Sequence, residues 1–289
     1  MESQENQYCW PKAEAVYPDR PERSYALKRL RYRLRAFLHR GLIAQFEQFI
    51  NQHPFLVTLL NEHADYSYPL VYRFLDKRFN SKQRFQAICD NLLFLPEKLT
   101  ALSAPIYKTP LSFGEVIPDF EMTLSMTTHQ PMEGYWVLEL WHKPRNELVY
   151  LLTFAKLGEA LLISVVQGPN FEGSKEMVKQ LTKMCHGLRP AYLMVETMKA
   201  LTKALGFNQL LGIPQKYQNK SRFIQSSHYV VDYDAIFAES GGLLKDYWEL
   251  SLEIDRNLDD VPSKKRSMYR KRHAMLDDLA KVIEEKLEL

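Results

Sequence analysis

The region from Asp119 to Gln167 constrains the fold most, because its apolar residues recur with a period close to two. This period predicts four strands, at residues 119–128, 134–143, 147–156 and 160–167. Short turns at Gly134, at Pro144-Arg145-Asn146 and at Gly158-Glu159 separate them. Connections this short join antiparallel neighbours, so the region predicts an antiparallel meander in the middle of the chain.

After the meander the pattern changes to one typical of helices. Helices are predicted at 174–185 and 190–205, since Pro190 suits a first helical position and Gly206 suits a stop. The remaining predicted elements are strands at 209–213, 229–237 and 247–254, a helix or loop at 217–226, and a long helix at 263–289. A strand reached across a helix is parallel to its neighbour, which predicts an α+β fold with a mixed, mostly antiparallel sheet and flanking helices.

The N-terminal third of the sequence predicts helices and proline-containing segments in place of strands. Residues 1–24 carry prolines among polar residues and are predicted to be a loose segment, and a proline-containing connector follows at 96–118. Helices are predicted between them, at 25–52, 54–63 and 67–94. These boundaries predict four parts: a loose segment 1–24, a helical region 25–110, a mixed α/β domain 111–262, and a basic C-terminal helix 263–289 that packs on the domain.

The helix predicted over 25–52 is amphipathic. Its apolar stripe consists of Leu27, Leu30, Leu34, Phe37, Leu38, Leu42, Phe46, Phe49 and Ile50. Its other face carries Lys28, Arg29, Arg31, Arg33, Arg35 and Arg40. Such a helix either packs its stripe into a core or lies on a membrane surface. We favour packing into the core, because that is the commoner use of an amphipathic helix.

Composition limits which cellular compartment and which binding partners are expected. The net charge is only +3, so any binding of a polyanion depends on local clusters. The three cysteines, Cys9, Cys89 and Cys185, form no CxxC pair, which disfavours a disulfide framework and predicts a reducing compartment. Residues 1–9 are polar, unlike a signal peptide, and the longest apolar run, 160–166, is too short to span a bilayer. We therefore expect a cytoplasmic protein, with peripheral contact at the inner membrane left open.

Three segments, in the same order, resemble the VirK/YbjX family of bacterial proteins across roughly residues 85–285. They are Leu181 to Pro190 (LTKMCHGLRP), Tyr233-Asp234 followed by Glu239-Ser240-Gly241-Gly242, and the basic run Ser263 to Arg272 followed by Met275-Leu276-Asp277. One departure is Phe237, near a position where the family often has tryptophan. The resemblance implies a role in virulence, envelope stress or resistance to antimicrobial peptides, and it implies no particular reaction. The order of strands and helices is also similar to that of N-acetyltransferases, which is a likeness of fold alone.

The segment around His186 is the first candidate site. Gln167 and Gly168 end the meander, while Gly187 and Arg189 precede the helix at 190–205. A glycine turn at a helix start can offer free backbone N–H groups to an anion, and an arginine can add a bidentate contact. In an acyltransferase these residues would hold the phosphates of acyl-CoA or of an acyl carrier protein, with His186 as the general acid or base. The alternative is an ordinary turn between two helices, with Gly187 in a left-handed conformation.

Glu239 is the second candidate for proton transfer, because Gly241-Gly242 lets the chain turn tightly beside it. On the strand predicted over 229–237, Asp232 and Asp234 would share one face, where mutual repulsion would raise the pKa of one of them. Capping of a turn or a solvated face is the alternative. Ser240 lacks the GxSxG context of serine hydrolases, and an HExxH-like zinc motif is absent from the sequence, so no metal site is predicted.

The start of the last predicted helix is strongly basic. Positive charge opposes the dipole at a helix N-terminus, so a compensating anion would stabilise it. The residues predicted to bind that anion are Lys265, Arg266, Tyr269 and Arg270, joined by Arg222. We expect this basic segment to fold over the His186 turn and enclose a negatively charged ligand.

These observations lead to three functional hypotheses. The first is an acyltransferase that uses acyl-CoA or an acyl carrier protein and acts in envelope maintenance. The second is a non-catalytic regulator or adaptor that binds membrane lipid or RNA through its basic helices, although no helix-turn-helix, RNP-like strand or zinc finger supports nucleic-acid binding. The third is a relative of an enzyme that has lost its chemistry.

Overall fold

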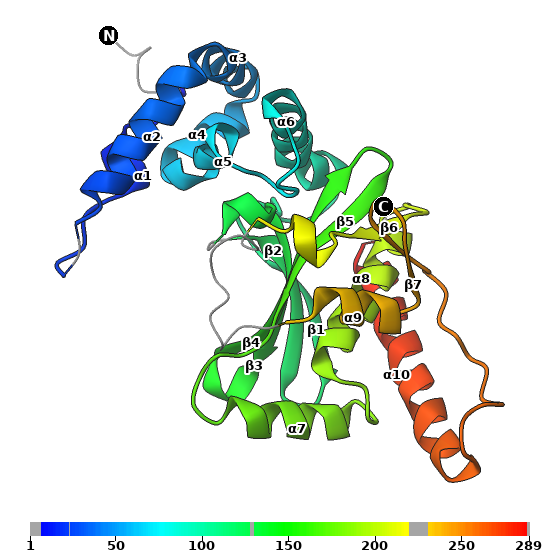
Figure 1. The fold of residues 1–289 in the computed structure, drawn as a ribbon. Coiled ribbons are helices and arrows are strands. Elements are labelled where there is room, and N and C mark those ends of the chain that lie inside the picture. Colours follow the sequence, from blue (N-terminus) through cyan, green and yellow to red (C-terminus); the bar gives the residue numbers. More distant parts are fainter. Residues whose placement is uncertain (1–6, 23, 128–129, 220–230, 288–289) are drawn as a thin grey trace.

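A computed structural model of the chain describes residues 7–22, 24–127, 130–219 and 231–287, and it is built around an eight-stranded sheet (Figure 1). The strands are β1 (Leu111–Ile117), β2 (Phe120–Met126), β3 (Trp136–His142), β4 (Glu147–Leu157), β5 (Ala160–Gln167), β6 (Leu210–Gly212), β7 (Gly242–Leu244) and β8 (Trp248–Leu250). They lie in the order β1-β2-β3-β4-β5-β6-β8-β7. Only the β5–β6 pair is parallel, which confirms the predicted α+β class with a mostly antiparallel sheet.

In the sequence, helices lie before the first strand, between later strands and after the last strand. They are α1 (Ala13–Val16), α2 (Ala26–Leu38), α3 (Arg40–Asn51), α4 (Pro54–Glu62), α5 (Tyr68–Val71), α6 (Ser81–Lys98), α7 (Ser174–Met184), α8 (Pro190–Ala204), α9 (Tyr233–Glu239) and α10 (Ser263–Lys286), with short 3-10 turns η1 (Ala64–Ser67), η2 (Pro131–Glu133), η3 (Lys143–Arg145) and η4 (Gln215–Tyr217). Helix α8 contacts β4, β5 and α10, and α10 also contacts β1. The predicted C-terminal helix therefore does lie along the sheet domain.

Alternation along the central strands decides which face of the sheet is covered. Met122 and Leu124 on β2 are fully buried, opposite the equally buried Leu140 and Leu138 on β3. Their neighbours on the other face, such as Thr123 and Glu139, are polar and partly exposed. Period-two alternation thus produces one apolar face, which helices cover, and one polar face.

Asn91 fastens helix α6 to the sheet. Its side-chain amide donates to the carbonyl oxygens of Ala87 and Lys156, both at 2.8 Å, and its carbonyl oxygen accepts from the Lys156 backbone N–H at 2.7 Å. The Trp136 indole N–H donates to the backbone carbonyl oxygen of Asn91 at 2.9 Å. Asn91 is completely buried, so these bonds satisfy every polar group of its side chain within the protein.

Three expectations for the N-terminal third are wrong. Residues 8–17 are not loose, because Tyr8 anchors them. Its side chain is 1% exposed, and its hydroxyl lies 2.7 Å from the Ser67 hydroxyl, so the ring is buried with its polar group paired. The helix predicted over 25–52 breaks at His39, between α2 and α3. The helix predicted over 67–94 is also interrupted, between α5 and α6, where Leu75 has a positive φ.

Two expectations for the sheet are wrong as well. Strand β1 occupies residues assigned to the connector, because Gly114 at φ +81° places an irregularity in the strand that hides its alternation. Of the strand predicted over 229–237, residues 229–230 lie outside the described residues, and the rest leads into helix α9. The Asp232 side chain accepts from the Ala235 N–H at 2.9 Å and so caps that helix, which places Asp232 and Asp234 on no common strand face.

We predict that Asn91→Ala lowers the free energy of unfolding by about 2–4 kcal/mol, since buried groups of Ala87 and Lys156 lose their partner. Urea denaturation followed by circular dichroism measures this change. Gln86→Ala, at an exposed position on the same helix, is the matched control and should change stability by less than about 0.5 kcal/mol. Equal effects of the two substitutions would show that Asn91 does not fasten α6 to the sheet.

Candidate functional site

Strand β5 contains one extra residue, Ser164. Thr153 of β4 pairs with Val165, whereas the next residue, Phe154, pairs with Ile163. Ser164 is buried, and its hydroxyl lies within hydrogen-bonding distance of two carbonyl oxygens, that of Thr153 at 3.0 Å and that of Glu133. A bulge of this kind bends the strand, increases its twist and re-aims the residues beside it.

Beyond this bulge, β5 and β6 part. Their parallel register covers Leu161–Ile163 against Leu210–Gly212, and one further bond runs from the Ile213 N–H to the Ile163 carbonyl at 3.0 Å. The next residue on that side is Pro214, which has no N–H to continue the ladder. We call this opening the fork, formed by residues 164–167 on β5 and residues 213–215 after β6.

The start of helix α9 is held at the fork by side-chain bonds. Gln215 Oε1 accepts from the Tyr233 N–H at 2.8 Å, and the Gln215 N–H donates to Asp234 Oδ1 at 3.0 Å. Asp234 Oδ1 also accepts from the indole N–H of Trp248 on β8 at 2.8 Å. Asp234 therefore positions α9, and Tyr233 occupies its first turn.

The Tyr233 hydroxyl reaches the fork itself. The N–H of Val166, the second residue after the bulge, faces the Tyr233 hydroxyl oxygen closely enough to lower the pKa of the phenol. Burial and the nearby charge of Glu133 raise the pKa of Tyr233 above its ordinary value, and the Val166 N–H only partly opposes that shift. The phenol therefore stays protonated at neutral pH and can act as a hydrogen-bond donor. Glu133, whose side chain is also buried, is tied into the same place because Ser164 binds its carbonyl oxygen.

The turn at His186 is built differently from the predicted phosphate site. The N–H groups of His186, Gly187 and Leu188 donate to the carbonyl oxygens of Lys183, Thr182 and Cys185. His186 and Gly187 both have positive φ, at +52° and +78°. The turn is thus the C-terminal stop of α7, as the alternative interpretation expected, and these three N–H groups are already engaged within the protein.

The C-terminal helix does reach this turn, through Arg272. Its guanidinium donates to the His186 carbonyl oxygen, at 3.3 Å from Nε and 3.0 Å from Nη2. Arg266 instead donates to the carbonyl oxygens of Val261 and Asp259, just before α10. Of the other residues predicted to bind an anion, Lys265 and Arg270 are exposed, Tyr269 lies beneath the Arg272 guanidinium at 4.2 Å, and Arg222 lies outside the described residues.

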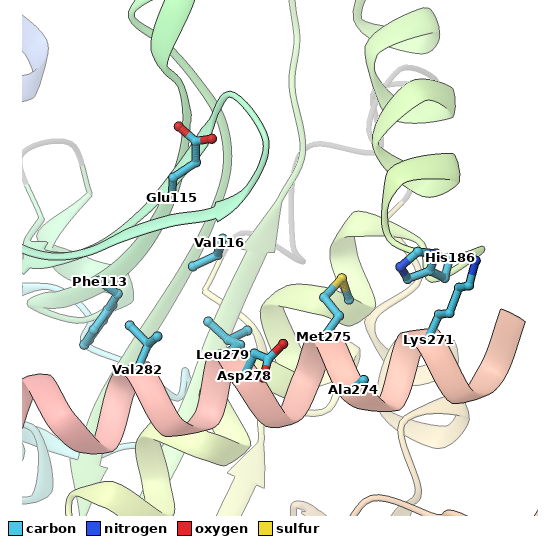
Figure 2. A pocket seen from close by; sticks show the side chains of 10 residues that line it. All are labelled: Phe113, Glu115, Val116, His186, Lys271, Ala274, Met275, Asp278, Leu279 and Val282. Carbon is cyan, nitrogen blue, oxygen red and sulfur yellow. The ribbon is translucent and has the colours of Figure 1, made fainter.

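A groove of about 350 Å³ separates α10 from the edge strand β1 (Figure 2). His186 and Lys271 stand together at one end of it. The lining also includes the carboxylates of Glu115 and Asp278, and it is otherwise mostly apolar, consisting of Phe113, Val116, Ala274, Met275, Leu279 and Val282. The basic helix and the His186 turn therefore meet as expected, but the space between β1 and α10 carries both signs of charge and does not select for an anion.

Glu239 belongs to another cluster. It accepts a hydrogen bond from the Tyr192 hydroxyl at 2.5 Å, and Arg189 lies 5.7 Å from the centre of the Tyr192 ring. Burial, and then the bond to Glu239, raise the pKa of Tyr192 to about 12. Gln167 and Gly168 end β5, where Gly168 packs against the Tyr150 ring. The predicted residues thus fall into separate groups, and proton transfer by His186 or Glu239 stays a prediction.

A family model described as a protein of unknown function, DUF535, matches residues 21–285. The chain belongs to the DUF535 family. An uncharacterised protein of Haemophilus influenzae is 80% identical over 98% of this chain and 97% of its own length. A protein of Mannheimia haemolytica named membrane protein LapB is 66% identical over 75% of this chain and 96% of its own.

The resemblance to YbjX is confirmed. The YbjX protein of Escherichia coli is 24% identical over 86% of this DUF535 chain and 80% of its own length. No solved structure matches the chain. Within the described ranges, none of the helices is both long enough and apolar enough to cross a bilayer.

Sequence reasoning missed the fork of this DUF535 protein. Ser164 is the only polar residue in the run Ala160–Val166, and a lone hydroxyl in an apolar strand is a signal for a bulge. In the sequence, Tyr233 stands out only as part of a family motif, because a strand is predicted where the helix begins. Glu133 carried no signal, because its position depends on contacts across the sheet.

We predict that only one of the three thiols of the native DUF535 chain reacts readily with iodoacetamide near neutral pH. Cys9 is exposed, whereas burial raises the pKa of Cys89 and of Cys185 to about 12, which keeps both as unreactive thiols. Mass spectrometry of peptides from native and urea-unfolded protein measures the labelling. Rapid native labelling of Cys185 would contradict the buried position described here.

Proposed function

We propose that this protein is an acyltransferase that binds the thioester of its acyl donor in the fork between β5 and β6. The observation that carries the proposal is the meeting of the Ser164 bulge, the backbone of Val166 and the hydroxyl of Tyr233 where the two strands part. A thioester carbonyl that enters there would accept from the Tyr233 O–H and would take over the Val166 N–H that now faces the Tyr233 oxygen. Two donors aimed at one carbonyl oxygen stabilise the negative charge that develops as the carbonyl is attacked.

The reaction follows from the groups present. An amine on the acceptor attacks the carbonyl carbon, the new C–N bond forms, and the C–S bond breaks to release the carrier thiol. The proton lost by the amine passes to the departing sulfur, and we assign its transfer to Glu133, the buried carboxylate whose charge raises the pKa of Tyr233. Direct transfer fits this site better than an acyl-cysteine intermediate, since the Cys89 and Cys185 thiols are buried and their pKa values are raised.

We place this activity in envelope maintenance on the cytoplasmic side, next to the inner membrane. The YbjX-type resemblance supports that setting, and so does the name membrane protein LapB carried by a relative that is 66% identical. Transfer from acyl-CoA or an acyl carrier protein releases the carrier as a free thiol, which stays reduced in the reducing compartment that a chain with three free cysteines suits.

A non-catalytic adaptor is the second candidate function. It is favoured by the engagement of the His186 turn, whose N–H groups bond within the protein, and by the exposed cations Lys265 and Arg270 at the start of α10. In that case acyl donors would not bind, while an anionic partner would raise the melting temperature of the chain.

We predict that Tyr233→Phe lowers the rate of acyl transfer by about 100-fold, because the carbonyl oxygen loses one of its two donors. The assay follows thiol release from acyl-CoA of several chain lengths, with hydroxylamine as the surrogate amine and a reaction without protein as the blank. Removal of the hydroxyl should leave the melting temperature nearly unchanged, so a loss of rate would not reflect unfolding.

Tyr192→Phe is the matched control. It removes the hydroxyl that binds Glu239, which ends α9 whereas Tyr233 begins it, and should retain nearly the wild-type rate. A large loss in Tyr192→Phe together with full activity in Tyr233→Phe would move the site to the Arg189–Glu239 cluster. Thiol release no faster than the blank for every chain length would reject the enzyme.

A further inference from the structure

Helix α2 exposes the apolar stripe that was expected to enter the core. The exposed fractions are 60% for Leu27, 51% for Leu30, 57% for Leu34, 65% for Phe37 and 76% for Leu38. Residues 27, 30, 34 and 37 follow spacings of three and four, so their side chains form one continuous face of the helix. The second half of the predicted stripe behaves differently, since Phe46 and Ile50 on α3 are completely buried.

The opposite face of α2 attaches the helix to the protein. Tyr32 is 2% exposed, stacks on Trp10 with ring centroids 6.0 Å apart, and donates to the Pro11 carbonyl oxygen at 2.8 Å. Arg35 donates to the Tyr68 hydroxyl at 2.9 Å. Because this inner face already holds α2 in place, the outer leucine stripe is not required to fix the helix.

Cations border the exposed stripe on both sides. On a helical wheel, Arg31 lies next to Leu27 and Leu38, while Arg33 lies on the other side, beyond Phe37. Arg31 is exposed and, among the described residues, takes part in no ion pair, whereas Arg33 pairs with Glu14. The sequence contains no aspartate or glutamate between Glu22 and Glu47, and the acidic partners of this stretch, Asp19 for Arg29 and Glu14 for Arg33, lie before it and leave Arg31 without an offsetting charge among the described residues.

We infer that the outer face of α2 docks the protein onto an anionic phospholipid bilayer, with the helix lying in the plane of the interface. Leu27, Leu30, Leu34 and Phe37 enter the boundary between headgroups and acyl chains, and Arg31 and Arg33 contact the phosphates. An apolar face bordered by arginines is what in-plane interfacial helices use, gaining from buried apolar area and from attraction to anionic lipid together.

The charges favour lipid over a second copy of the chain. Two α2 faces packed on each other would bring the Arg31 side chains of both copies together, and Arg31 has no acidic partner among the described residues, which disfavours association. A bilayer that contains anionic lipid supplies both the apolar layer and the negative charge. This inference names the surface through which the protein would contact the membrane, and it does not depend on acyl transfer.

The test is co-sedimentation of the full chain with vesicles of phosphatidylcholine alone and of phosphatidylcholine mixed with phosphatidylglycerol. The wild type should bind the mixed vesicles far better than the neutral ones, and added salt should weaken that binding because salt screens the arginines. Leu30→Gln with Leu34→Gln should reduce binding by at least about tenfold, since two apolar side chains no longer enter the interface. Glutamine keeps good helix propensity at these exposed positions.

Leu243→Gln with Leu244→Gln is the matched control, because it removes two exposed leucines from β7 at 64% and 48% exposure. It should bind vesicles like the wild type. Equal vesicle binding by the two double variants would overturn the inference. So would a wild-type dimer in solution that Leu30→Gln with Leu34→Gln converts to a monomer, since the stripe would then serve self-association. Thiol release measured without vesicles reports separately on the acyltransferase, and it should be the same in both double variants.

Discussion

The buried hydroxyl of Ser164 is the interaction on which the arrangement of the proposed site depends. It lies within reach of the carbonyl oxygens of Thr153 and Glu133, and so joins β5, β4 and the turn before β3 at one point. The bulge fixed there bends the last residues of β5, while Pro214 has no N–H with which to continue the ladder from β6. The end of pairing between the two strands therefore follows from covalent and hydrogen-bond geometry.

The membrane contact proposed for the N-terminal region does not involve this sheet. Asn91 and Trp136 fasten α6 to β4 and β3, while Tyr8 and Tyr32 hold the first segments through buried or partly buried hydroxyl bonds. With these inner contacts made, α2 is free to present leucines outward. If both proposals hold, this surface would keep the acyltransferase near an envelope acceptor while it draws its acyl donor from solution.

How far the sequence predicts this structure depends on whether a feature is local. The strands at 136–142, 147–157 and 160–167, the helices α7, α8 and α10, and the parallel β6 follow from alternation, Pro190 and glycine stops. The break at His39 was missed because helical periodicity continues across it, and that break lets Leu34 face outward while Phe46 is buried. Helix α9 was missed because its start depends on the Asp232 cap and on Gln215, which no pattern in the local sequence brings together. For the same reason, only the three-dimensional structure shows that Tyr233, Val166 and Glu133 lie near one another. The contact between α10 and the His186 turn was expected from the sequence, but the residue that makes it, Arg272, was not among those predicted.

The central claim is that a thioester carbonyl enters the fork at Val166, and the backbone amide of that residue reports on it directly. The most direct measurement is a titration of ¹⁵N-labelled protein with a non-hydrolysable acyl-CoA analogue, followed by nuclear magnetic resonance. The account predicts that the amide signals of Val165, Val166 and Gln167 shift in a saturable way, together with those at the start of α9. Saturable shifts confined to the β1–α10 groove or to α2, with the Val166 signal unmoved, would contradict it.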